Sequence, residues 1–432
     1  MQAVITPSLI SGTLIAPASK SAMQRACAAA LIRQGTTILY NPGVSADDKS
    51  ALNIIEQLGA SVSFNEDSIV IESNGVKPGP EKSTPYKIDC GESGLCVRMF
   101  TSIASIYEHE INIKGQGSLL KRPMNFFDQT LPLLDVACTS KGGFLPLSVQ
   151  GPLIPKDITI DGSLSSQFLT GLLFAYSAAC AKGVRIMVNN LSSKPYIDLT
   201  LDVMKKFGLK VPCNDSYKTF YFEETDVALV KAETIDFVVE SDWSGAAFHL
   251  VGGAIAGNIS VKGLDLNSTQ GDRAIMHALM QAGAVMDIKD NIIEVRQSNL
   301  TAFHFDATDC PDLFPPLVVL AAFCDGESTI RGVHRLTHKE SNRSVALQQE
   351  FRKMSVEIFL DKDVMKIKGA QKLSGAIVDS HHDHRIAMAC AIAGLNALGS
   401  TTVNDAEAVN KSYPQFWNHL HELGASVSLN HN

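Results

Sequence analysis

The chain has 432 residues, of which 45% are hydrophobic and 19% charged, so it has a globular composition and is too long for one typical hydrophobic core; we expect two domains. A formal net charge of -8 without any Lys/Arg-rich run excludes the broad basic face of a nucleic-acid-binding protein. The nine cysteines include no C-x-x-C pair, which excludes zinc fingers. The sequence has no basic signal segment and no apolar run of about 18 residues, which argues against secretion and membrane insertion. Together these features predict a cytoplasmic protein.

Amphipathic helices that end at a short break recur along the chain. Apolar residues at helical spacing, as in Ile275, Leu279 and Ala282, predict a helix, and a small alternating strand follows it. Clear copies lie at 51–64, 201–211, 275–288, 347–358 and 416–429, and a weaker copy at 126–140 is interrupted by Pro132. In most copies the break is a glycine, because a helix commonly ends in a left-handed residue. In 347–358 the break lies near Met354.

A second piece recurs between these helices: a β-rich strand that runs into a loop with Lys, Arg or Ser. Its copies start near residues 36, 110, 184, 258, 328 and 401, a period of roughly 70 to 75 residues, so we interpret each repeat as a small α/β subdomain. The two chain ends together make up roughly one period. We therefore expect the N-terminal strand to complete the C-terminal repeat. This gives a continuous central domain over 19–236, of three repeats, and a discontinuous terminal domain over 1–18 plus 237–432, also of three.

The first candidate anion site is PASKSAMQR, residues 17–25. It places Lys20, Ser21 and Arg25 at the start of an apolar helix, where unpaired N–H groups and the helix dipole attract anions. The alternative is a serine N-cap with solvated charges. CGESGLCVR and KRPM, further along the chain, contribute Gly94, Arg98 and Arg122.

Two later segments also place polar side chains just before helices. DGSLSSQFLTG contains Ser165, Ser166 and Gln167, and LSSKPYIDLT contains Ser193, Lys194 and Tyr196. Capping is the default interpretation of such serines, and phosphate binding is the alternative. A serine hydrolase is not indicated, because no G-x-S-x-G elbow occurs here.

The last third of the chain carries carboxylates among its cations. CPDLFPP contains Asp312, in a loop that a plain Asx turn would also explain. HKESNRS places Lys339 and Arg343 one helical turn apart with Glu340 between them, a pattern typical of a solvated salt-bridged face. NKSYPQF adds Lys411.

SHHDHRIAMACAIAG, which starts at residue 380, places His384 and Arg385 at the head of a strongly apolar helix. The side chains of His381, His382, Asp383 and His384 offer an alternative as metal ligands, but adjacent residues rarely converge on one ion, so we expect no metal.

Most of these cations and serines lie at repeat junctions, although the chain as a whole is acidic. If the repeats fold alike, the junctions gather at equivalent ends. An ion pair at 4 Å is worth about 4 kcal/mol at an effective dielectric of 20, so clustered cations favour ligands of several negative charges. We therefore expect two small phosphorylated acids as substrates.

Eight motifs in order, PASKSAMQR, KRP, DGSLSSQFLTG, SKPYIDLT, CPDLFPP, HKESNR, HDHRIAMA and NKSYP, resemble the 5-enolpyruvylshikimate-3-phosphate synthase family of enolpyruvyl transferases. The resemblance covers the whole chain. It implies an α/β fold of the inside-out α/β barrel type, with two domains of three βαβαββ units each and the active site in the cleft between them. It also implies a monomeric transferase that acts on phosphoenolpyruvate and shikimate-3-phosphate by addition and elimination, without a cofactor, a metal, nucleic acid or a membrane.

The family's residue roles carry over to matching positions. The resemblance implies that Asp312 takes the proton of the attacking 5-hydroxyl, and that Glu340 protonates the methylene carbon and later removes a proton from the methyl group. Lys20 and His384 are the other catalytic candidates. Shikimate-3-phosphate would be held by Lys20, Ser21, Arg25, Ser165, Ser166, Gln167, Ser193, Tyr196, Asp312 and Lys339. Phosphoenolpyruvate would be held by Lys20, Gly94, Arg122, Gln167, Arg343, Arg385 and Lys411.

Three motifs depart from the family pattern. GESGLCVR has Glu92 where Asn is usual and Leu95 where Thr is usual, K-E-S-N-R stands for K-E-T-D-R, and His382 stands where Asn is usual. The acid, the base and the arginines are retained.

Two other functions fit the sequence less well. The sister enzyme UDP-N-acetylglucosamine enolpyruvyl transferase opens with G-A-K-N and has a catalytic cysteine loop of P-G-G-C type, both missing here. A non-enzymatic ring around nucleic acid would need basic residues along helices that line a hole, whereas here they lie in junction loops beside Asp312 and Glu340.

Overall fold

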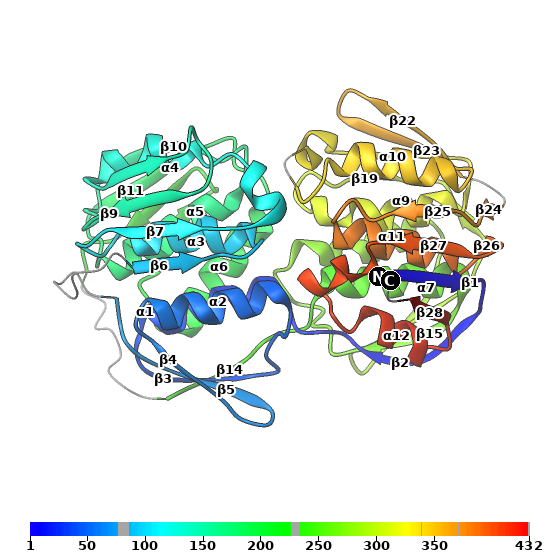
Figure 1. Cartoon of the computed structure of the whole chain (residues 1–432), viewed down its shortest axis with the longest axis horizontal. Helices are drawn as coiled ribbons and strands as arrows, with labels where there is room; N and C mark the ends of the chain where they lie inside the picture. The colour runs from blue at the N-terminus through cyan, green and yellow to red at the C-terminus, as the bar shows by residue number, and fades with distance from the viewer. Residues whose placement is uncertain (77–85, 226–233, 338, 370–371, 431–432) are drawn as a thin grey trace. The chain divides into compact units, whose positions relative to one another are not determined.

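A computed structural model describes residues 1–76, 86–225, 234–337, 339–369 and 372–430 (Figure 1). The chain divides into two compact units. The terminal unit consists of Met1–Pro17 together with Glu240–Asn432, and the central unit is Ala18–Val239. No helix in the described ranges combines the length and the apolar character that a membrane crossing requires.

The central unit alternates helices and strands. Its helices are α1 (Lys20–Ile32), α2 (Ala46–Gln57), α3 (Gly94–Ala104), α4 (Asn125–Thr130), α5 (Ser166–Ala178) and α6 (Lys194–Lys206), with 3-10 turns η1 (Gly117–Lys121) and η2 (Leu131–Leu134). Its strands are β3 (Gln34–Tyr40), β4 (Ser61–Phe64), β5 (Ser68–Asn74), β6 (Tyr86–Asp89), β7 (Ile111–Lys114), β8 (Ala137–Ser140), β9 (Leu147–Gln150), β10 (Ile158–Asp161), β11 (Val184–Asn189), β12 (Cys213–Asp215), β13 (Thr219–Phe222) and β14 (Ile235–Val238).

The terminal unit is built in the same way. Its helices are α7 (Trp243–Ala256), α8 (Ile275–Gln281), α9 (Phe314–Ala322), α10 (Arg343–Lys353), α11 (His384–Gly394) and α12 (Phe416–Glu422), with 3-10 turns η3 (Gly271–Ala274), η4 (Pro311–Leu313), η5 (Val333–Leu336) and η6 (Ala406–Lys411). Its main strands are β1 (Gln2–Thr6), β2 (Ile10–Ile15), β15 (Gly257–Lys262), β16 (Val285–Lys289), β17 (Ile292–Arg296), β19 (His304–Asp306), β21 (Glu327–Arg331), β22 (Glu357–Asp361), β23 (Val364–Lys368), β25 (Ile377–Asp379), β27 (Thr401–Asn404) and β28 (Ser426–Asn430). The unit also contains two short pairs, β18 (Leu300–Thr301) with β20 (Cys324–Asp325) and β24 (Leu373–Ser374) with β26 (Ala397–Leu398).

The described residues form six four-stranded sheets of one design. The strand orders are β14-β3-β5-β4, β6-β7-β9-β8 and β10-β11-β13-β12 in the central unit, and β2-β15-β17-β16, β19-β21-β23-β22 and β25-β27-β1-β28 in the terminal unit. In each sheet the first pair in this order is parallel and the other two pairs are antiparallel. In four of the sheets one helix bridges the parallel pair, as in β6–α3–β7 and β25–α11–β27, whereas β2 and β15, and β14 and β3, pair across long stretches of the chain.

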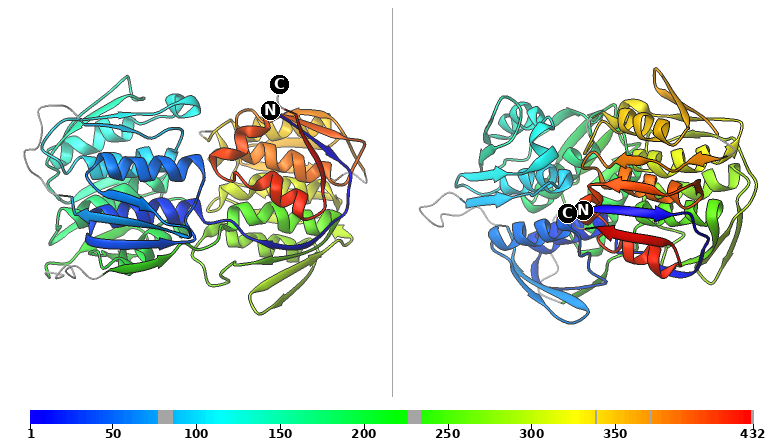
Figure 2. Two further views of the ribbon diagram at one scale, coloured as in Figure 1. Left: turned by 60° about the horizontal axis from the view of Figure 1, so that its bottom comes forward. Right: turned by 45° about the vertical axis from the view of Figure 1, so that its right-hand side comes forward.

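The strands predicted from the repeat are confirmed, and each occupies the same place. They are β3, β7, β11, β15, β21 and β27, and every one is the second strand of its sheet. The prediction that the N-terminal strand completes the C-terminal repeat is also confirmed. β1 lies between β27 and β28, with Ala3 opposite Val403 on one side and Leu429 on the other. Figure 2 shows β1 beside β28 in both views, with the two chain ends close together.

The predicted helix breaks have the left-handed conformation that terminates a helix. Gly59, Gly208, Gly283 and Gly424 all have positive φ, between 66° and 104°. The two copies without glycine reach the same conformation with other residues. Asp135 follows the Pro132 copy at φ 62°, and Ser355 follows Met354 at φ 68°. Position therefore matters more than residue type at these breaks, although glycine adopts the conformation with the least strain.

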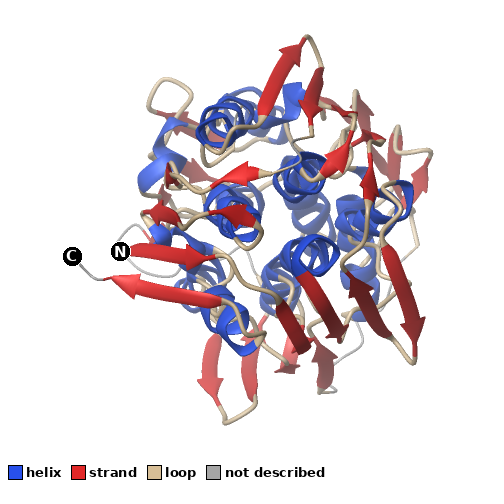
Figure 3. Ribbon diagram, turned by 90° about the vertical axis from the view of Figure 1, so that its right-hand side faces the viewer, coloured by secondary structure: helices blue, strands red, loops and turns tan. Residues whose placement is uncertain are grey.

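Three apolar helices occupy the centre of each unit. α1, α3 and α5 form the core of the central unit, and α7, α9 and α11 that of the terminal unit, with nearly every residue of these helices buried. Figure 3 faces the terminal unit and shows helices inside a surround of strands. α5 approaches α3 closely because Gly171 has no side chain; a Cβ there would lie 2.6 Å from the carbonyl oxygen of Arg98. A helix enclosed in this way is apolar all round, so only its ends remain for charged chemistry.

Candidate active site

In the central unit, the start of α1 carries the first predicted anion site. Ser19 is the N-cap and accepts a hydrogen bond from the backbone N–H of Ala22, so the capping interpretation is correct for that serine. The Lys20 ammonium donates to Asp47 Oδ2 at 2.9 Å, at the start of α2. Asp47 was not singled out from the sequence.

Arg25 lies deeper in the same unit. Its Nε donates to Thr200 Oγ1 at 2.9 Å, and its two terminal nitrogens donate to the carbonyl oxygens of Ser21 (2.8 Å) and Tyr196 (3.2 Å). The side chain is almost fully buried. Arg25 therefore ties the beginnings of α1 and α6 together, and it brings the sequence-predicted Ser21 and Tyr196 into one set of contacts.

Gly94 lies against two arginines at the start of α3. A Cβ at this position would stand 2.6 Å from Arg122 Nη1 and 3.5 Å from Arg98 Nη1. Arg98 Nη1 in turn donates to Gln167 Oε1 at 2.9 Å. The absence of a side chain at residue 94 lets the guanidinium of Arg122 approach a helix N-terminus, which is a favourable place for an anion.

The remaining serines predicted for the central unit lie at helix starts. Ser165 is the N-cap of α5 and its hydroxyl accepts from the backbone N–H of Gln167 at 3.3 Å. Ser166 is buried in the first turn of that helix. Ser193 is the N-cap of α6 and has φ 56°, a left-handed conformation that is uncommon for serine. The prediction that these residues sit at helix starts is correct.

The terminal unit gathers its carboxylates around Arg343, at the start of α10. Arg343 donates to Glu340 Oε2 at 2.6 Å, to Asp312 Oδ1 at 2.7 Å and to Asp383 Oδ2 at 2.8 Å. Only 1% of its side chain is exposed. Burial works against the charge, but the three carboxylates outweigh it and raise the pKa of Arg343 above its ordinary value. This pattern is the opposite of the solvated face that the K-E-S-N-R spacing usually indicates.

Asp312, in η4, is shared by three cations. Besides Arg343, it accepts from Lys339 Nζ at 3.1 Å and from Arg385 Nη2 at 3.2 Å. Burial favours the neutral acid, but Arg385, Lys339 and Arg343 together hold the pKa of Asp312 well below its usual range. Asp312 is therefore ionised at neutral pH, and a quarter of its side chain is exposed.

Glu340 and Lys411 meet in the same cluster, with Lys411 Nζ 3.9 Å from Glu340 Oε1. Asp383 is the N-cap of α11 and accepts from the backbone N–H of Arg385 at 3.0 Å. His384 is buried at the first position of α11, and its Nδ1 lies 3.9 Å from Asp383 Oδ1. The terminal unit thus brings together all its predicted site residues: Asp312, Lys339, Glu340, Arg343, His384, Arg385 and Lys411. His338, the first residue of the HKESNR motif, lies outside the described residues.

The side chains of the SHHDHR motif turn to different partners. His381 pairs with Glu350 (Nε2 to Oε1, 2.8 Å), His382 pairs with Asp405 (Nδ1 to Oδ2, 2.7 Å) and Asp383 pairs with Arg343. Among the residues that the structure describes, no group of three or more His, Cys, Asp or Glu is arranged to hold a metal ion. The two histidine pairs connect the loop before α11 to α10 and to the start of η6, which leads to Lys411.

A further buried acid, Asp272, was missed in the sequence. It lies in η3 and accepts from the hydroxyl of Ser244. Burial, and then the nearby charge of Asp312, raise the pKa of Asp272 to about 6. The sequence signal was slight, since QGDRA resembles an ordinary turn before a helix.

Each unit supplies carboxylate counter-ions for several of its predicted cations. In the central unit Asp47 pairs with Lys20, and in the terminal unit Asp312, Glu340 and Asp383 surround Arg343. The physical reason is that a buried charge without a partner is strongly destabilising, so the fold pairs these cations without a ligand. Substrate anions would then compete with these carboxylates for the cations.

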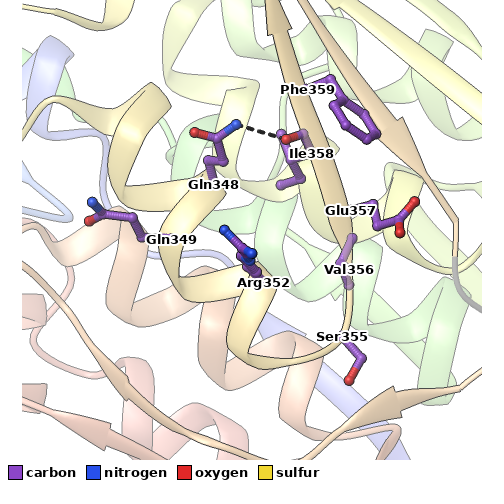
Figure 4. Close-up of a pocket in the computed structure, with 8 residues that line it drawn as sticks. All are labelled: Gln348, Gln349, Arg352, Ser355, Val356, Glu357, Ile358 and Phe359. Carbon is purple, nitrogen blue, oxygen red and sulfur yellow. Dashed lines mark hydrogen bonds between the residues drawn. The ribbon is translucent and has the colours of Figure 1, made fainter.

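A pocket of about 650 Å³ lies elsewhere in the terminal unit, between the second half of α10 and β22 (Figure 4). Gln348 on α10 donates across it to the carbonyl oxygen of Ile358 at 2.8 Å. Its lining residues are Gln348, Gln349, Arg352, Ser355, Val356, Glu357, Ile358 and Phe359. None of them belongs to the predicted site.

The chain is similar over nearly its whole length to known proteins. A family model described as EPSP synthase (3-phosphoshikimate 1-carboxyvinyltransferase) matches residues 4–420. The 3-phosphoshikimate 1-carboxyvinyltransferase of Clostridium novyi (strain NT) is 35% identical over 428 residues, 98% of this chain and 97% of the relative. That of Methanocaldococcus jannaschii is 35% identical over 427 residues, 97% of each.

Solved structures agree. An EPSP synthase from Acinetobacter baumannii has a TM-score of 0.81 at 25% identity, covering 99% of this chain and 100% of that chain. The enolpyruvyl transferase NikO from Streptomyces tendae has a TM-score of 0.76 at 14% identity, covering 99% and 98%, and shows the likeness of the fold.

Proposed function

The chain belongs to the EPSP synthase family, whose model spans residues 4–420, and on that premise we propose how its clustered side chains carry out the reaction. The enzyme transfers the enolpyruvyl group of phosphoenolpyruvate to the 5-hydroxyl of shikimate-3-phosphate and releases phosphate, a step in the biosynthesis of aromatic amino acids. The observation that supports the residue roles best is the cluster in which Arg343 joins Asp312 and Glu340.

In our proposal the central unit supplies most contacts to shikimate-3-phosphate. These come from Lys20, Ser21, Arg25, Ser165, Ser166, Gln167, Ser193 and Tyr196, and the terminal unit adds Asp312 and Lys339. The helix starts at α1, α5 and α6 support this assignment, because they offer backbone N–H groups and hydroxyls to an anion.

Phosphoenolpyruvate is assigned to cations of both units. The central unit contributes Lys20, Gly94, Arg122 and Gln167, and the terminal unit Arg343, Arg385 and Lys411. The proposal requires the two units to contact both substrates in the closed enzyme, which would exclude water from the reacting groups. A crystal structure with both substrates in which only one unit touches them would contradict it.

The two carboxylates have separate tasks in the addition step. Asp312 accepts the proton of the 5-hydroxyl while the hydroxyl oxygen forms its bond to C2 of phosphoenolpyruvate, and Glu340 gives a proton to C3. The product of this step is a tetrahedral intermediate with a methyl group. The low pKa of Asp312 means that its carboxylate is ionised before the substrates arrive, so an acceptor for the proton is present.

Elimination reverses the use of Glu340. Its carboxylate removes a proton from the methyl group, the C2–C3 double bond forms and the C2–O bond to phosphate breaks. Arg343, Arg385 and Lys411 would stabilise the departing phosphate. His384 is proposed to act within this cluster, from its buried position beside Asp383.

The fold is proposed to be of the inside-out α/β barrel type. The enzyme is proposed to act as a monomer, which light scattering would test, and in the cytoplasm, which cell fractionation would test. All nine cysteines are free, as such a location favours.

Phosphate release tests the function directly. We expect release on mixing the protein with both substrates and none with either alone. UDP-N-acetylglucosamine in place of shikimate-3-phosphate tests the sister activity, and retention on a DNA column at low salt tests the nucleic-acid alternative. Release with the nucleotide sugar alone as acceptor would refute the proposal.

A further inference from the structure

Glu92 is the residue of the predicted phosphate-binding region that the reaction does not explain. It lies two residues before Gly94, where a negative charge would be expected to repel phosphoenolpyruvate. Its carboxylate is directed to the loop that follows β7. Oε2 accepts from both the backbone N–H and the hydroxyl of Ser118, each at 3.2 Å.

The loop that receives Glu92 is shaped for it. Gly117 has φ 54°, and a Cβ there would stand 2.4 Å from Cδ of Glu92. A side chain at residue 117 would therefore displace the carboxylate. The neighbouring backbone is joined to the same loop, since the N–H of Gln116 donates to the carbonyl oxygen of Gly91 at 2.7 Å. β6 and β7 are parallel neighbours, so the loops at their C-terminal ends lie side by side.

Ser118 is also hydrogen-bonded to Arg122. Arg122 Nη2 donates to Ser118 Oγ at 3.3 Å, and Nη1 occupies the space that a side chain at Gly94 would need, 2.6 Å from where a Cβ of that residue would stand. The guanidinium is thus placed between Ser118 and Gly94. The Ser118 hydroxyl has one proton, and because it donates that proton to Glu92, its lone pairs remain for Arg122.

We propose that Glu92 is a positioning residue for phosphoenolpyruvate binding: by holding Ser118, it fixes the guanidinium of Arg122 against the start of α3. The inference deepens the proposed function and rests on it. It also accounts for an acid in this loop, because the carboxylate accepts hydrogen bonds from the backbone N–H and the hydroxyl of Ser118.

The direction in which the KM for phosphoenolpyruvate changes shows whether Glu92 positions Arg122 or repels the substrate. If Glu92 positions Arg122, Glu92→Ala raises the KM for phosphoenolpyruvate about tenfold and leaves the KM for shikimate-3-phosphate unchanged, as the loss of hydrogen bonds to a charged group would do. If the acid merely repels the substrate, the same change lowers the KM for phosphoenolpyruvate. An unchanged or lower value overturns the proposal.

Two further variants test the route through Ser118. Glu92→Gln keeps an acceptor oxygen and should restore the KM for phosphoenolpyruvate to within about threefold of the wild type. Ser118→Ala should raise that KM as Glu92→Ala does, while Glu92 stays in place. Loss in the glutamine variant equal to that in the alanine variant, or a normal KM in Ser118→Ala, contradicts the proposal.

A matched control lies at the sheet β6-β7-β9-β8, whose strands β6 and β7 lead into the loops of Glu92 and Ser118. Glu110 accepts from the hydroxyl of Ser148 at the surface of the central unit, so Glu110→Ala removes a similar glutamate–serine contact outside the site. Both KM values should stay normal in that variant, and a raised KM for phosphoenolpyruvate there would overturn the specific role of Glu92. Wild-type phosphate release is measured first. Its absence would refute the proposed function, whereas normal wild-type turnover with a normal KM in Glu92→Ala refutes only this inference.

Discussion

Replacement of Asp383 by asparagine should destabilise the terminal unit strongly, although the two side chains have nearly the same shape. The Asp383 side chain is fully buried and makes two hydrogen bonds to Arg343, from Nε at 2.8 Å and from Nη2 at 3.2 Å. It also accepts from the Ser341 hydroxyl at 3.0 Å and caps α11. Asparagine keeps an acceptor oxygen for the cap but loses the charge and one acceptor.

The expected loss in the free energy of unfolding follows from the burial of Arg343. Removing one partner of a buried ion pair costs about 3 to 5 kcal/mol, because the other charge is left in a poorly solvated place. Arg343 retains Asp312 and Glu340 in the variant, so we expect the lower end, about 3 kcal/mol. Asp383→Ala also removes the cap of α11 and should cost about 1 kcal/mol more.

Tryptophan fluorescence reports this unit alone. The chain has two tryptophans, and both Trp243 and Trp417 are buried in the terminal unit. Urea unfolding followed at their emission therefore gives the stability of that unit without a contribution from the central unit, which avoids treating the whole chain as two-state. Glu357→Gln is the control, since its ion pair with Lys368 spans 3.5 Å and both side chains are mostly exposed. It should cost less than about 1 kcal/mol.

If Asp383→Asn lowers the free energy of unfolding no more than the control Glu357→Gln does, the prediction is refuted. Such a result would mean that the two remaining carboxylates satisfy Arg343 by themselves. A change in the urea m-value without a shift of the midpoint would also count against it, because it would point to altered compactness and not to lost pairing.

Three other predictions concern catalysis and pH. Asp312→Asn and Glu340→Gln should each lower kcat by about 10²- to 10⁴-fold and keep most of the substrate binding, and near-normal turnover would exclude the assigned proton transfers. Lys411→Met should raise the KM for phosphoenolpyruvate only; an equal rise for shikimate-3-phosphate would contradict its assignment. Asp272 has a pKa of about 6 in the fold and 3.8 as its reference value, so its favourable contribution is complete below pH 4 and is lost as the pH rises through 6. Asp272→Asn should therefore gain stability relative to the wild type between pH 4 and 7, by about 3 kcal/mol in urea unfolding, and a difference that does not vary with pH would disprove this.

Much of the fold was predictable because each repeat is specified locally. A helical apolar stripe, a break and a short strand depend on contacts within about twenty residues, and their order predicted all six second strands correctly. The break predicted near Met354 is found at Ser355, and in the copy that Pro132 interrupts the left-handed residue is Asp135. The barrel type, the domain limits and the roles of the site residues remain predictions.

The partners of the charged side chains were much less predictable. The K-E-S-N-R spacing indicated a solvated helix face, yet Arg343 is buried among three carboxylates that lie 3, 31 and 40 residues away. Asp47, Asp272 and Glu92 were likewise either missed or left without a role. Their significance depends on which loops become neighbours, and sequence spacing within one motif contains no information on that.

By itself, the sequence determined the repeated α/β pattern, the pairing of the first strand with the last repeat, and the helix starts at which polar residues would gather. These follow from periodicity and from the chemistry of helix ends, which act over a few residues. Only the tertiary structure decided which acid neutralises which cation, because ion pairs such as Arg343–Asp383 join side chains that meet only after the sheets and helices have packed. Because these side chains are buried, the loss of any one pairing is strongly destabilising, since a charge removed from water needs a partner in the fold.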